Sequence, residues 1–489
     1  MPGPLCVSAR LSNTKMKKIL FIGFILINVQ LFSQKKGFLS NNKLNSDLEY
    51  FKNVIYNCHP APFSYISKDS IDKVFLLFKF QEDTSVLVLE KRIEIILSKI
   101  GCAHTELKNS SFEHNKFILP FEFYVNPQGV FIKNTLTDSL DYLKGFKVVS
   151  INGNSTETII NVMKNFKASD GYNETLKYQL LSYKDNLSVL YNYYFDQDSI
   201  KTLNLLNDKE DTIIKNIQTI KYSSKKEKDR DKNGKKICKY NYLKIDTLNQ
   251  LALLNIRSFG ISRIRVVNSY KKLFRTLNDL KIKYFILDLR DNTGGNVLSS
   301  ELLLSYLLDT SYNNCMIRKK TDLFKHSTKI SKFYYVLEYM ARPMIFIKNK
   351  EVTDSSIIRK RTINNRIKNN YKNELFVITN GFTASGASYF SSVLKNKQQA
   401  TIIGQETGGG AASLNGAFYS TVKLPNSRLK ISIPVYHIDF DLIEDKGHGV
   451  IPDYKIEYNI NDIINGIDLE YNKIIEIIEN NAPTHNSGS

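Results

Sequence analysis

The chain has little cysteine and proline for its length, and only one apolar run of any note. Of its 489 residues, 5 are Cys and 11 are Pro. The cysteines are widely spaced, at Cys6, Cys58, Cys102, Cys238 and Cys315. Because no CxxC pair or Cys/His cluster is present, the sequence excludes a disulfide scaffold and a zinc module. A single N-terminal stretch could enter a bilayer, which excludes a polytopic membrane protein.

Acidic residues are outnumbered by basic ones. There are 68 Lys and Arg against 48 Asp and Glu, which gives a formal net charge of +20. Such an excess is typical of proteins with an anionic partner. The basic residues, however, are scattered, and no recognition helix, zinc finger or aromatic-basic repeat concentrates them, so we expect no nucleic-acid binding. The 42% hydrophobic content excludes global disorder, collagen and coiled coil.

Residues 1–34 are predicted to be an upstream extension followed by a secretory signal. A positive Met16-Lys17-Lys18 precedes the apolar run at 19–27, which is too short to span a bilayer comfortably. The alternatives are an uncleaved anchor and a buried N-terminal helix. We expect an exported protein, periplasmic or extracellular, with membrane contact only through an uncleaved leader if at all.

Hydrophobic periodicity divides the rest of the chain. Apolar residues recur with the helical period up to Ile100, where Gly101 ends the run. Beyond residue 240, buried strands alternate with helices, which predicts an α/β fold. The predicted parts are 35–112, an N-terminal helical segment; 116–168, a small β-rich domain; 169–240, a connecting region with a Lys-rich loop at 223–236; 241–470, the α/β core; and 471–489, a C-terminal tail.

The most informative segment is a buried strand at 375–379 followed by a turn and a helix. Ser385 stands at this junction, where the positive end of the helix favours a developing negative charge. Its hydroxyl becomes a nucleophile once a base removes the proton. The alternative is that Thr383 or Ser385 only caps the helix.

A second strand-to-helix junction lies at 288–296 and contains Gly294 and Gly295. Two glycines let the backbone approach a ligand closely and point N–H groups toward it. The spacing is not that of a Walker A loop or a dinucleotide fingerprint. A plain tight turn is the alternative.

Three motifs in order resemble the C-terminal processing (tail-specific) serine protease family: DLRDNTGG at 288–295, TASGAS at 383–388 and IGQETG at 403–408. The segment 143–153 resembles the PDZ module of these proteases, and GVIPD at 449–453 resembles their closing motif. The resemblance covers roughly residues 45–460. It implies a crotonase-like α/β core, a PDZ-like β-rich domain and a serine endopeptidase of protein or peptide substrates, whose PDZ-like segment would recognise substrate C-termini. Together with the predicted leader, this gives an exported serine endopeptidase.

By this resemblance, Ser385 is the nucleophile, and the backbone of Gly386 with Gly294 or Gly295 forms the oxyanion hole. One branch of the family places a catalytic lysine after the Gly-Glu-x-Thr element. Here the corresponding stretch, TGGGAA at 407–412, has no lysine. Lys423 and Lys430 come later, on a predicted pair of strands, so a Ser-Lys dyad is not expected.

The other branch, similar to the tricorn core protease, uses a histidine from the N-terminal part. The element GCAHTEL at 101–107 resembles its motif and implies that His104 is the base, although Ala103 replaces the serine of that branch. A carboxylate has to orient such an imidazole. By resemblance it comes just before Gly449, which leaves Asp445 or Glu444, and we prefer Asp445.

Other histidines offer alternatives to this assignment. His437 and His448 flank the candidate acids and are alternative bases, whereas His59 is expected to be structural. No metal or organic cofactor is implied, and the oligomeric state is open. A non-catalytic ligand-binding protein on the same scaffold is the alternative function.

Overall fold

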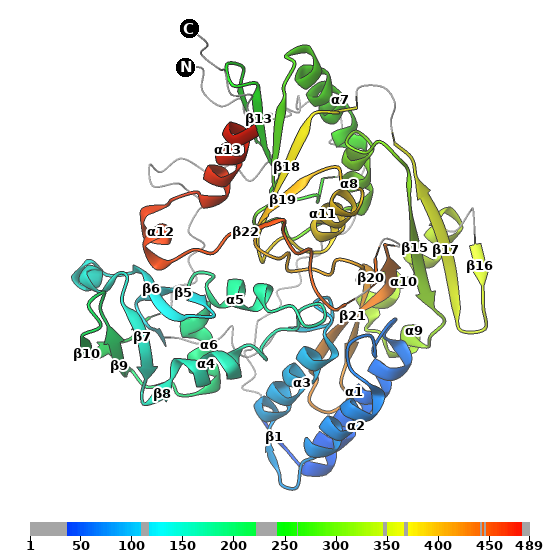
Figure 1. Cartoon of the computed structure of the whole chain (residues 1–489). Helices are drawn as coiled ribbons and strands as arrows, with labels where there is room; N and C mark the ends of the chain where they lie inside the picture. Colours follow the sequence, from blue (N-terminus) through cyan, green and yellow to red (C-terminus); the bar gives the residue numbers. More distant parts are fainter. Residues whose placement is uncertain are drawn as a thin grey trace, which may run out of the picture.

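The computed structural model describes residues 37–108, 117–221, 242–261, 263–345, 350–365, 370–440, 443–444 and 446–481 (Figure 1). The predicted leader, the Lys-rich loop at 223–236 and Asp445 lie outside these residues. The described part is a mixed α/β fold, as the sequence predicts. Within it, none of the helices combines the length and apolar character needed to cross a bilayer.

The N-terminal segment is helical, as predicted. Its elements are α1 (Asn41–Cys58), α2 (Lys68–Leu77) and α3 (Val86–Ile100), with the short pair β1 (Phe38–Leu39) and β2 (Thr84–Ser85). The helices share one hydrophobic core with a long hairpin formed by β20 (Ser413–Lys423) and β21 (Lys430–Asp439). Ile431 and Ile433 of β21, for example, are buried in that core together with Leu89 and Ile93 of α3. This segment is therefore one half of a joint core, which fixes the end of α3 relative to the hairpin.

The middle of the chain forms an antiparallel sheet in the order β10-β9-β7-β6-β5. Its strands are β5 (Phe121–Asn126), β6 (Gly129–Thr135), β7 (Lys147–Ile151), β9 (Ile200–Leu206) and β10 (Thr212–Gln218), with β8 (Asn154–Ser155) beside β7. The helical elements of this unit are η2 (Asp138–Leu143), α4 (Thr156–Met163), α5 (Thr175–Leu181) and α6 (Asn186–Tyr194).

This sheet extends past the predicted β-rich domain at 116–168 into the predicted connecting region. The reason is that β7 is an interior strand, and its second edge pairs with β9. The short strands β4 (Phe117–Ile118) and β11 (Ile220–Lys221) pair with each other. The chain thus enters and leaves the unit side by side, and we call residues 117–221 the middle unit.

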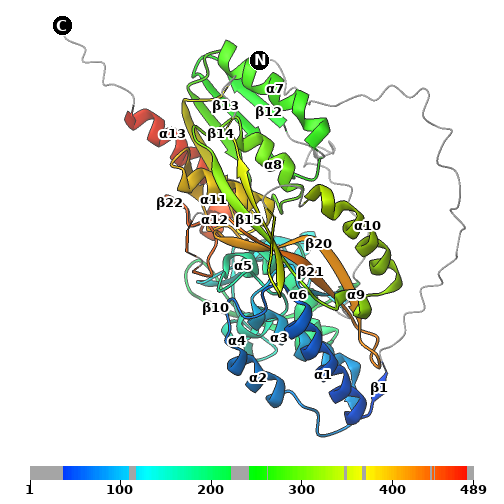
Figure 2. The same cartoon turned by 90° about the vertical axis from the view of Figure 1, so that its right-hand side faces the viewer.

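The α/β core follows the predicted alternation of strands and helices (Figures 1 and 2). Its sheet contains, in spatial order, β12 (Tyr242–Asp246), β13 (Leu251–Asn255), β14 (Tyr284–Asp288), β18 (Glu374–Thr379), β19 (Thr401–Gly404) and β22 (Tyr454–Lys455). All strands from β13 to β22 run parallel, and β12 is antiparallel. The helices are α7 (Arg263–Asp279), α8 (Val297–Leu304) and α11 (Gly386–Asn396) on one face, α13 (Leu469–Asn481) on the other, and α12 (Ile460–Asn465) before α13.

A third sheet is built around the β20–β21 hairpin. It contains β16 (Lys350–Val352), β17 (Ser356–Ile363), β15 (Tyr312–Lys319), β21 and β20, with β3 (Glu106–Lys108) on β21 and the helices α9 (Leu323–His326) and α10 (Lys329–Ile345) nearby. Lys423 and Lys430 are direct partners in the hairpin, which confirms the predicted strand pair. Because β3 follows the 101–105 turn directly, its pairing with β21 places that turn beside the β20–β21 hairpin.

Arg290 joins the carboxyl end of β14 to the C-terminal helix. Its guanidinium donates to Asp288, Asp468 and Glu470 over 2.9–3.2 Å. Glu470 is only 2% exposed, so its charge has little access to water and depends on Arg290.

We predict that Arg290→Met lowers the free energy of unfolding by about 3 kcal/mol, because it leaves buried carboxylates without their cation. Urea unfolding followed by circular dichroism measures the effect. The matched control is Arg257→Met, which removes an exposed ion pair with Asp291 and costs under about 1 kcal/mol. Equal losses in the two variants would contradict this role of Arg290.

Candidate active site

Ser385 lies at the carboxyl edge of the parallel sheet, between β18 and α11. Its backbone has φ 53° and ψ −122°, a conformation that residues with a side chain rarely adopt. Although Ser385 occupies the N-cap position, its hydroxyl makes no capping hydrogen bond. The capping alternative is therefore not what the structure shows, and the half-buried hydroxyl is free to react. Such a strained strand-to-helix turn is how a nucleophilic serine is exposed in other hydrolase folds.

The loop after β14 holds the Ser385 turn in place. The Ala384 N–H donates to Asn292 O at 3.0 Å, and the Thr383 hydroxyl donates to Leu289 O at 2.9 Å. The Asn292 side chain also accepts from the Gly294 N–H at 2.9 Å. These neighbouring parallel strands end at the same edge, so the two predicted junctions meet in space.

Glycine is needed where the two junctions touch. A Cβ on Gly294, whose φ is 99°, would stand 2.8 Å from Ser385 Cβ and 2.8 Å from Gly386 N. A Cβ on Gly386 would stand 3.6 Å from Gly295 N. Neither the Gly386 nor the Gly295 N–H donates a hydrogen bond within the described residues. Two free donors therefore lie beside the Ser385 side chain, as an oxyanion hole requires.

His104 reaches the core through the turn that ends α3. Gly101 caps that helix in the left-handed conformation, with φ 70°, and the chain then turns toward β3. The ring of His104 stacks on Tyr419 of β20, with centroids 6.1 Å apart. Its Nδ1 is buried and has no hydrogen-bond partner in the described residues. A buried ring nitrogen without a partner is costly, so this atom calls for a partner beyond the described contacts.

Asp170 connects the His104 turn to the loop that packs against Ser385. Its Oδ1 accepts from the Ala103 N–H at 2.9 Å, and its Oδ2 accepts from the Gly410 N–H at 3.3 Å. Gly409 is packed so closely that a Cβ there would stand 2.7 Å from Ser385 N. No sequence motif marks Asp170, which lies in the middle unit, so the sequence alone does not point to it.

Glu406 makes a second connection at the same boundary. Its Oε1 accepts from Asn173 Nδ2 and the Gly449 N–H, both at 2.8 Å, and lies 3.3 Å from Nδ1 of His448. His448 is thus partly exposed and engaged by Glu406 rather than by Ser385. Among the described contacts, no hydrogen bond joins His104 or His448 to Ser385.

The remaining predicted residues fall into two groups. His59 is fully buried 2.9 Å from the Thr105 hydroxyl, and burial lowers its pKa to about 3, so it stays neutral. His437 contacts the Asn415 side chain at 3.0 Å. Both rings thus have hydrogen-bond partners of their own, Thr105 and Asn415. Glu444 is exposed, and Asp445 lies outside the described residues.

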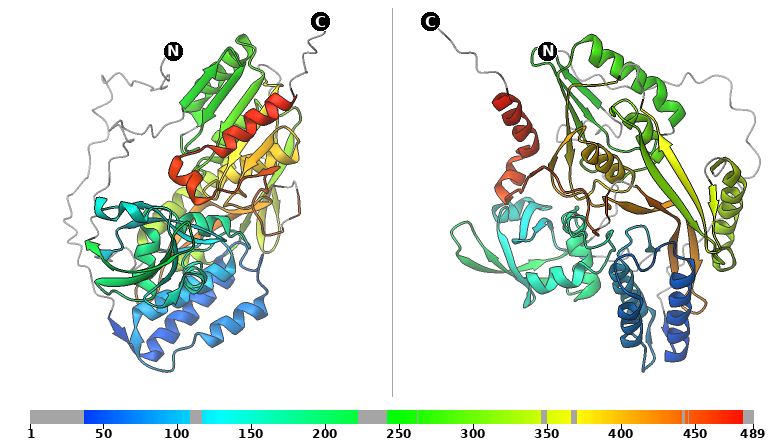
Figure 3. Two further views of the ribbon diagram at one scale, coloured as in Figure 1. Left: turned by 60° about the vertical axis from the view of Figure 1, so that its left-hand side comes forward. Right: turned by 45° about the vertical axis from the view of Figure 1, so that its right-hand side comes forward.

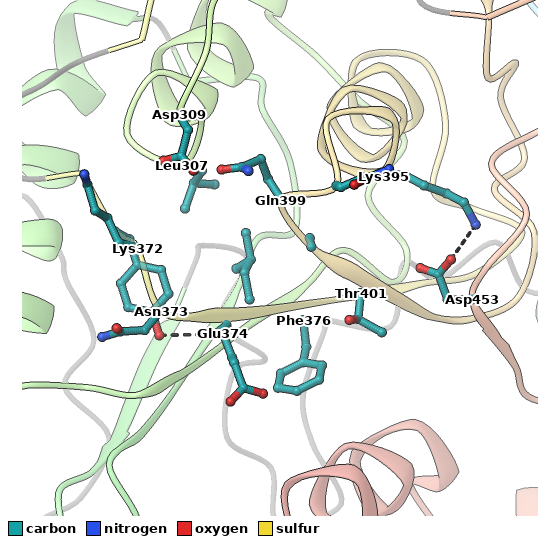
Figure 4. A pocket seen from close by; sticks show the side chains of 14 residues that line it. Leu307, Asp309, Lys372, Asn373, Glu374, Phe376, Lys395, Gln399, Thr401 and Asp453 are labelled. Carbon is teal, nitrogen blue, oxygen red and sulfur yellow. Dashed lines mark hydrogen bonds and ion pairs between the residues drawn. The ribbon is translucent and has the colours of Figure 1, made fainter. Parts of the chain in front are cut away.

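A hollow of about 740 Å³ opens on the opposite edge of the sheet (Figure 4). It is lined by residues at the amino ends of β18 and β19, such as Glu374 and Thr401, and by the Lys395–Asp453 ion pair. Since active sites of open α/β sheets form at the carboxyl edge, we do not assign chemistry to this hollow. No cluster of metal-binding side chains occurs in the part of the chain that the structure describes.

Comparisons with known proteins identify a family for the part of the chain that carries Ser385. Residues 242–456 match the family described as Peptidase family S41, and this range contains both junctions. No curated protein matches the chain.

Two solved structures are similar over nearly the whole chain. The structure of mature CPAF complexed with lactacystin is 13% identical, with a TM-score of 0.61, and the match covers 90% of this chain and 98% of that one. A crystal structure of a CPAF mutant is 14% identical, with a TM-score of 0.62, and covers 91% and 99%. At these identities the likeness shows a shared fold.

We predict that Asp170→Asn slows reaction at Ser385 by about 100-fold. The amide NH₂ group of asparagine would face the N–H group of Ala103 or of Gly410, which is itself a donor, and would displace the loop that carries it. The rate of Ser385 labelling by a fluorophosphonate probe measures this. Asp198→Asn, the same change at an exposed position of the middle unit, should leave the rate unchanged. A slower rate together with an equally lowered melting temperature would instead indicate a purely structural role.

Proposed function

We propose a catalytic assignment for this chain. Residues 242–456 are a domain of peptidase family S41. The chain is a serine-type peptidase that acts on proteins or peptides. Ser385 is the nucleophile and His104 is its general base. The observation that carries the proposal is the strained Ser385 backbone, with its hydroxyl uncapped and two free N–H groups beside it.

The proposed reaction follows from these positions. Ser385 Oγ attacks the scissile carbonyl carbon while His104 Nε2 accepts its proton, and the carbonyl oxygen becomes an oxyanion. The N–H groups of Gly386 and Gly295 donate to that oxyanion. His104 then protonates the leaving amine, the C–N bond breaks, and a water activated by His104 hydrolyses the acyl-enzyme.

The substrate has to complete this arrangement, because the described structure has no hydrogen bond between His104 and Ser385. Catalytic hydrogen bonds are often long in the absence of substrate and tighten in the Michaelis complex. The buried Nδ1 of His104 also lacks an acceptor. We assign that role to Asp445, with Glu444 as the alternative, since a carboxylate at Nδ1 would fix the tautomer that leaves Nε2 free.

A ligand-binding protein on the same scaffold is the competing function. It would have no use for a serine held in a strained conformation, which costs about 1–3 kcal/mol. The strain and the free donors therefore support the enzyme.

For the fold in finer detail, we propose that the α/β core is crotonase-like and that the middle unit is PDZ-like. The hairpin β5–β6, the strand β7 and the helix α4 support the second assignment. In a PDZ-type mode, a peptide adds as a strand to an exposed edge, and its C-terminal carboxylate is held by backbone N–H groups.

The edge that such a peptide would use is partly occupied in this structure. Ser182, at the end of α5, accepts from the Val125 N–H at 2.8 Å, and its hydroxyl lies 3.1 Å from Val125 O. Both outward groups of Val125 in β5 are thus engaged. We propose that a substrate C-terminus adds to β5 only when α5 moves away, so that the middle unit gates as well as docks.

We further propose that the protein is exported to the periplasm or the cell exterior. The positive residues and short apolar run at 16–27 support this. Export would place the peptidase among secreted proteins.

The test of the catalytic assignment is labelling with a fluorophosphonate, followed by peptide mapping. We expect the label on Ser385, its loss in Ser385→Ala, and labelling about 100- to 10,000-fold slower in His104→Ala. Asp445→Asn should slow labelling more than Glu444→Gln. Labelling that survives His104→Ala but not His448→Ala or His437→Ala would move the base, and no label at any pH would favour the ligand-binding protein.

The test of C-terminal recognition compares one peptide substrate with a free C-terminus and with an amidated one. We expect kcat/KM to favour the free acid by about tenfold, with a larger ratio in Ser182→Ala, because the cover over β5 loses its hydrogen bonds to Val125. Ser199→Ala, an exposed serine at the start of β9, is the control. Equal kcat/KM values for both peptides in the wild type, Ser182→Ala and Ser199→Ala would refute the PDZ-like role.

A further inference from the structure

Helix α10 exposes an apolar face and buries a polar one. Five large apolar side chains recur with helical spacing, and each is 44–72% exposed: Ile330, Phe333, Tyr334, Leu337 and Met340. We call these five residues the α10 stripe. A surface helix normally turns such a stripe toward the core. A continuous exposed stripe of this size marks an interaction surface.

The inner face of α10 is already fully engaged. Ser331 Oγ accepts from the Thr421 N–H at 2.9 Å, and Glu338 forms an ion pair with Arg318 at 3.2 Å. Tyr436 also donates to the Glu338 carboxylate. Glu338 and Arg318 are 1% and 4% exposed, so rotating the helix to bury the stripe would leave two buried charges unpaired. The helix is fixed to β20, and its stripe faces away from the protein.

The pictures agree with this placement. In Figure 2 and in the right panel of Figure 3, α10 runs along the outer side of the third sheet, with no other helix or strand drawn over it. Whatever covers the stripe must come from outside the described fold.

The surroundings of the stripe are basic. Lys329 lies on α10 and is exposed, Lys332 is half-buried beside Phe324, and Lys325 on α9 is 73% exposed. The nearby acid Asp322 is paired with Lys325 at 2.8 Å. Glu338, the one acid in the helix, is buried. An apolar stripe with a lysine border fits a surface that is anionic outside and apolar beneath.

We infer that α10 is an interfacial helix that binds the surface of an anionic lipid bilayer. The stripe would enter the boundary between headgroups and acyl chains, and Lys325, Lys329 and Lys332 would face the phosphates. Tyr334 and Phe333 suit that depth, because aromatic rings gather at membrane interfaces. A second copy of this chain fits less well, since it carries the same lysine border and a net charge of +20. The sequence predicted membrane contact only through the leader, so a contact through α10 would be additional.

The absence of tryptophan from the chain makes a direct test available. In the full chain, Phe333→Trp provides a single reporter on the stripe. We expect its emission to shift to shorter wavelength with phosphatidylcholine vesicles that contain phosphatidylglycerol, and to stay unchanged with phosphatidylcholine alone. Raising the salt concentration should weaken the shift, because screening removes the lysine contribution.

Sedimentation with the same vesicles separates the stripe from the rest of the surface. We expect Phe333→Asp and Met340→Asp each to weaken binding by at least about tenfold. Ile214→Asp, at a 68% exposed apolar residue of β10, is the matched control and should bind as the wild type does. Circular dichroism checks that each variant is folded.

Three results would overturn the inference. They are an unshifted Phe333→Trp emission with anionic vesicles, equal binding of the wild type and Phe333→Asp, and equal binding to neutral and anionic vesicles. A dimer in sedimentation velocity that Phe333→Asp dissociates, without vesicle binding, would assign the stripe to a second copy instead.

Discussion

The conformation of Ser385 is the constraint on which the rest of the site depends. A positive φ at a residue with a side chain costs about 1–3 kcal/mol, so neighbouring groups have to enforce it. They do so through the hydrogen bonds of Ala384 to Asn292 and of Thr383 to Leu289. The close packing of Gly294 against Ser385 completes the support. Each of these contacts crosses from β18 to the loop after β14, which explains why two motifs almost 90 residues apart are both required.

His104 reaches this site by a different route. The N-terminal helices bury their apolar faces against the β20–β21 hairpin, and β3 pairs with β21 directly after the His104 turn. The proposed base, His104, is therefore held by the same hydrophobic core that stabilises the hairpin. This arrangement couples the position of one imidazole to the folding of some 60 upstream residues, from α1 to α3.

The sequence points to Ser385 and the Gly294-Gly295 turn only through their collinear resemblance to a known family, because the local strand–turn–helix patterns alone also fit a helix cap and a plain tight turn. The structure shows the two junctions in contact. Asp170 could not be found in this way, because its partners Ala103 and Gly410 lie 67 and 240 residues away. The same limit applies to β9 and β10. Their place in the sheet depends on the pairing of β9 with the second edge of β7, which is distant in the sequence.

Helix α10 shows a further limit. Its apolar side chains recur with helical spacing, and a rule that turns such a face inward would place the stripe in the core. Here the ion pair between Arg318 and Glu338 decides the orientation instead.

The boundary between the middle unit and the core controls the geometry of the site. Asp170 binds the His104 turn and the loop at 405–410 with one carboxylate, while Asn173, three residues later, donates to Glu406 of the same loop. The Tyr172 N–H also donates to Gly447 O at 2.7 Å, close to the candidate acids. A displacement of the segment 170–173 would thus move the His104 turn, the loop that packs against Ser385 and the backbone at Gly447 together. Because α5 follows this segment directly and covers β5, a peptide that displaced α5 would pull on these contacts. Under the proposed docking of a peptide on β5, its binding and the approach of His104 to Ser385 would be linked through the backbone of a few residues, without any need for a long-range pathway.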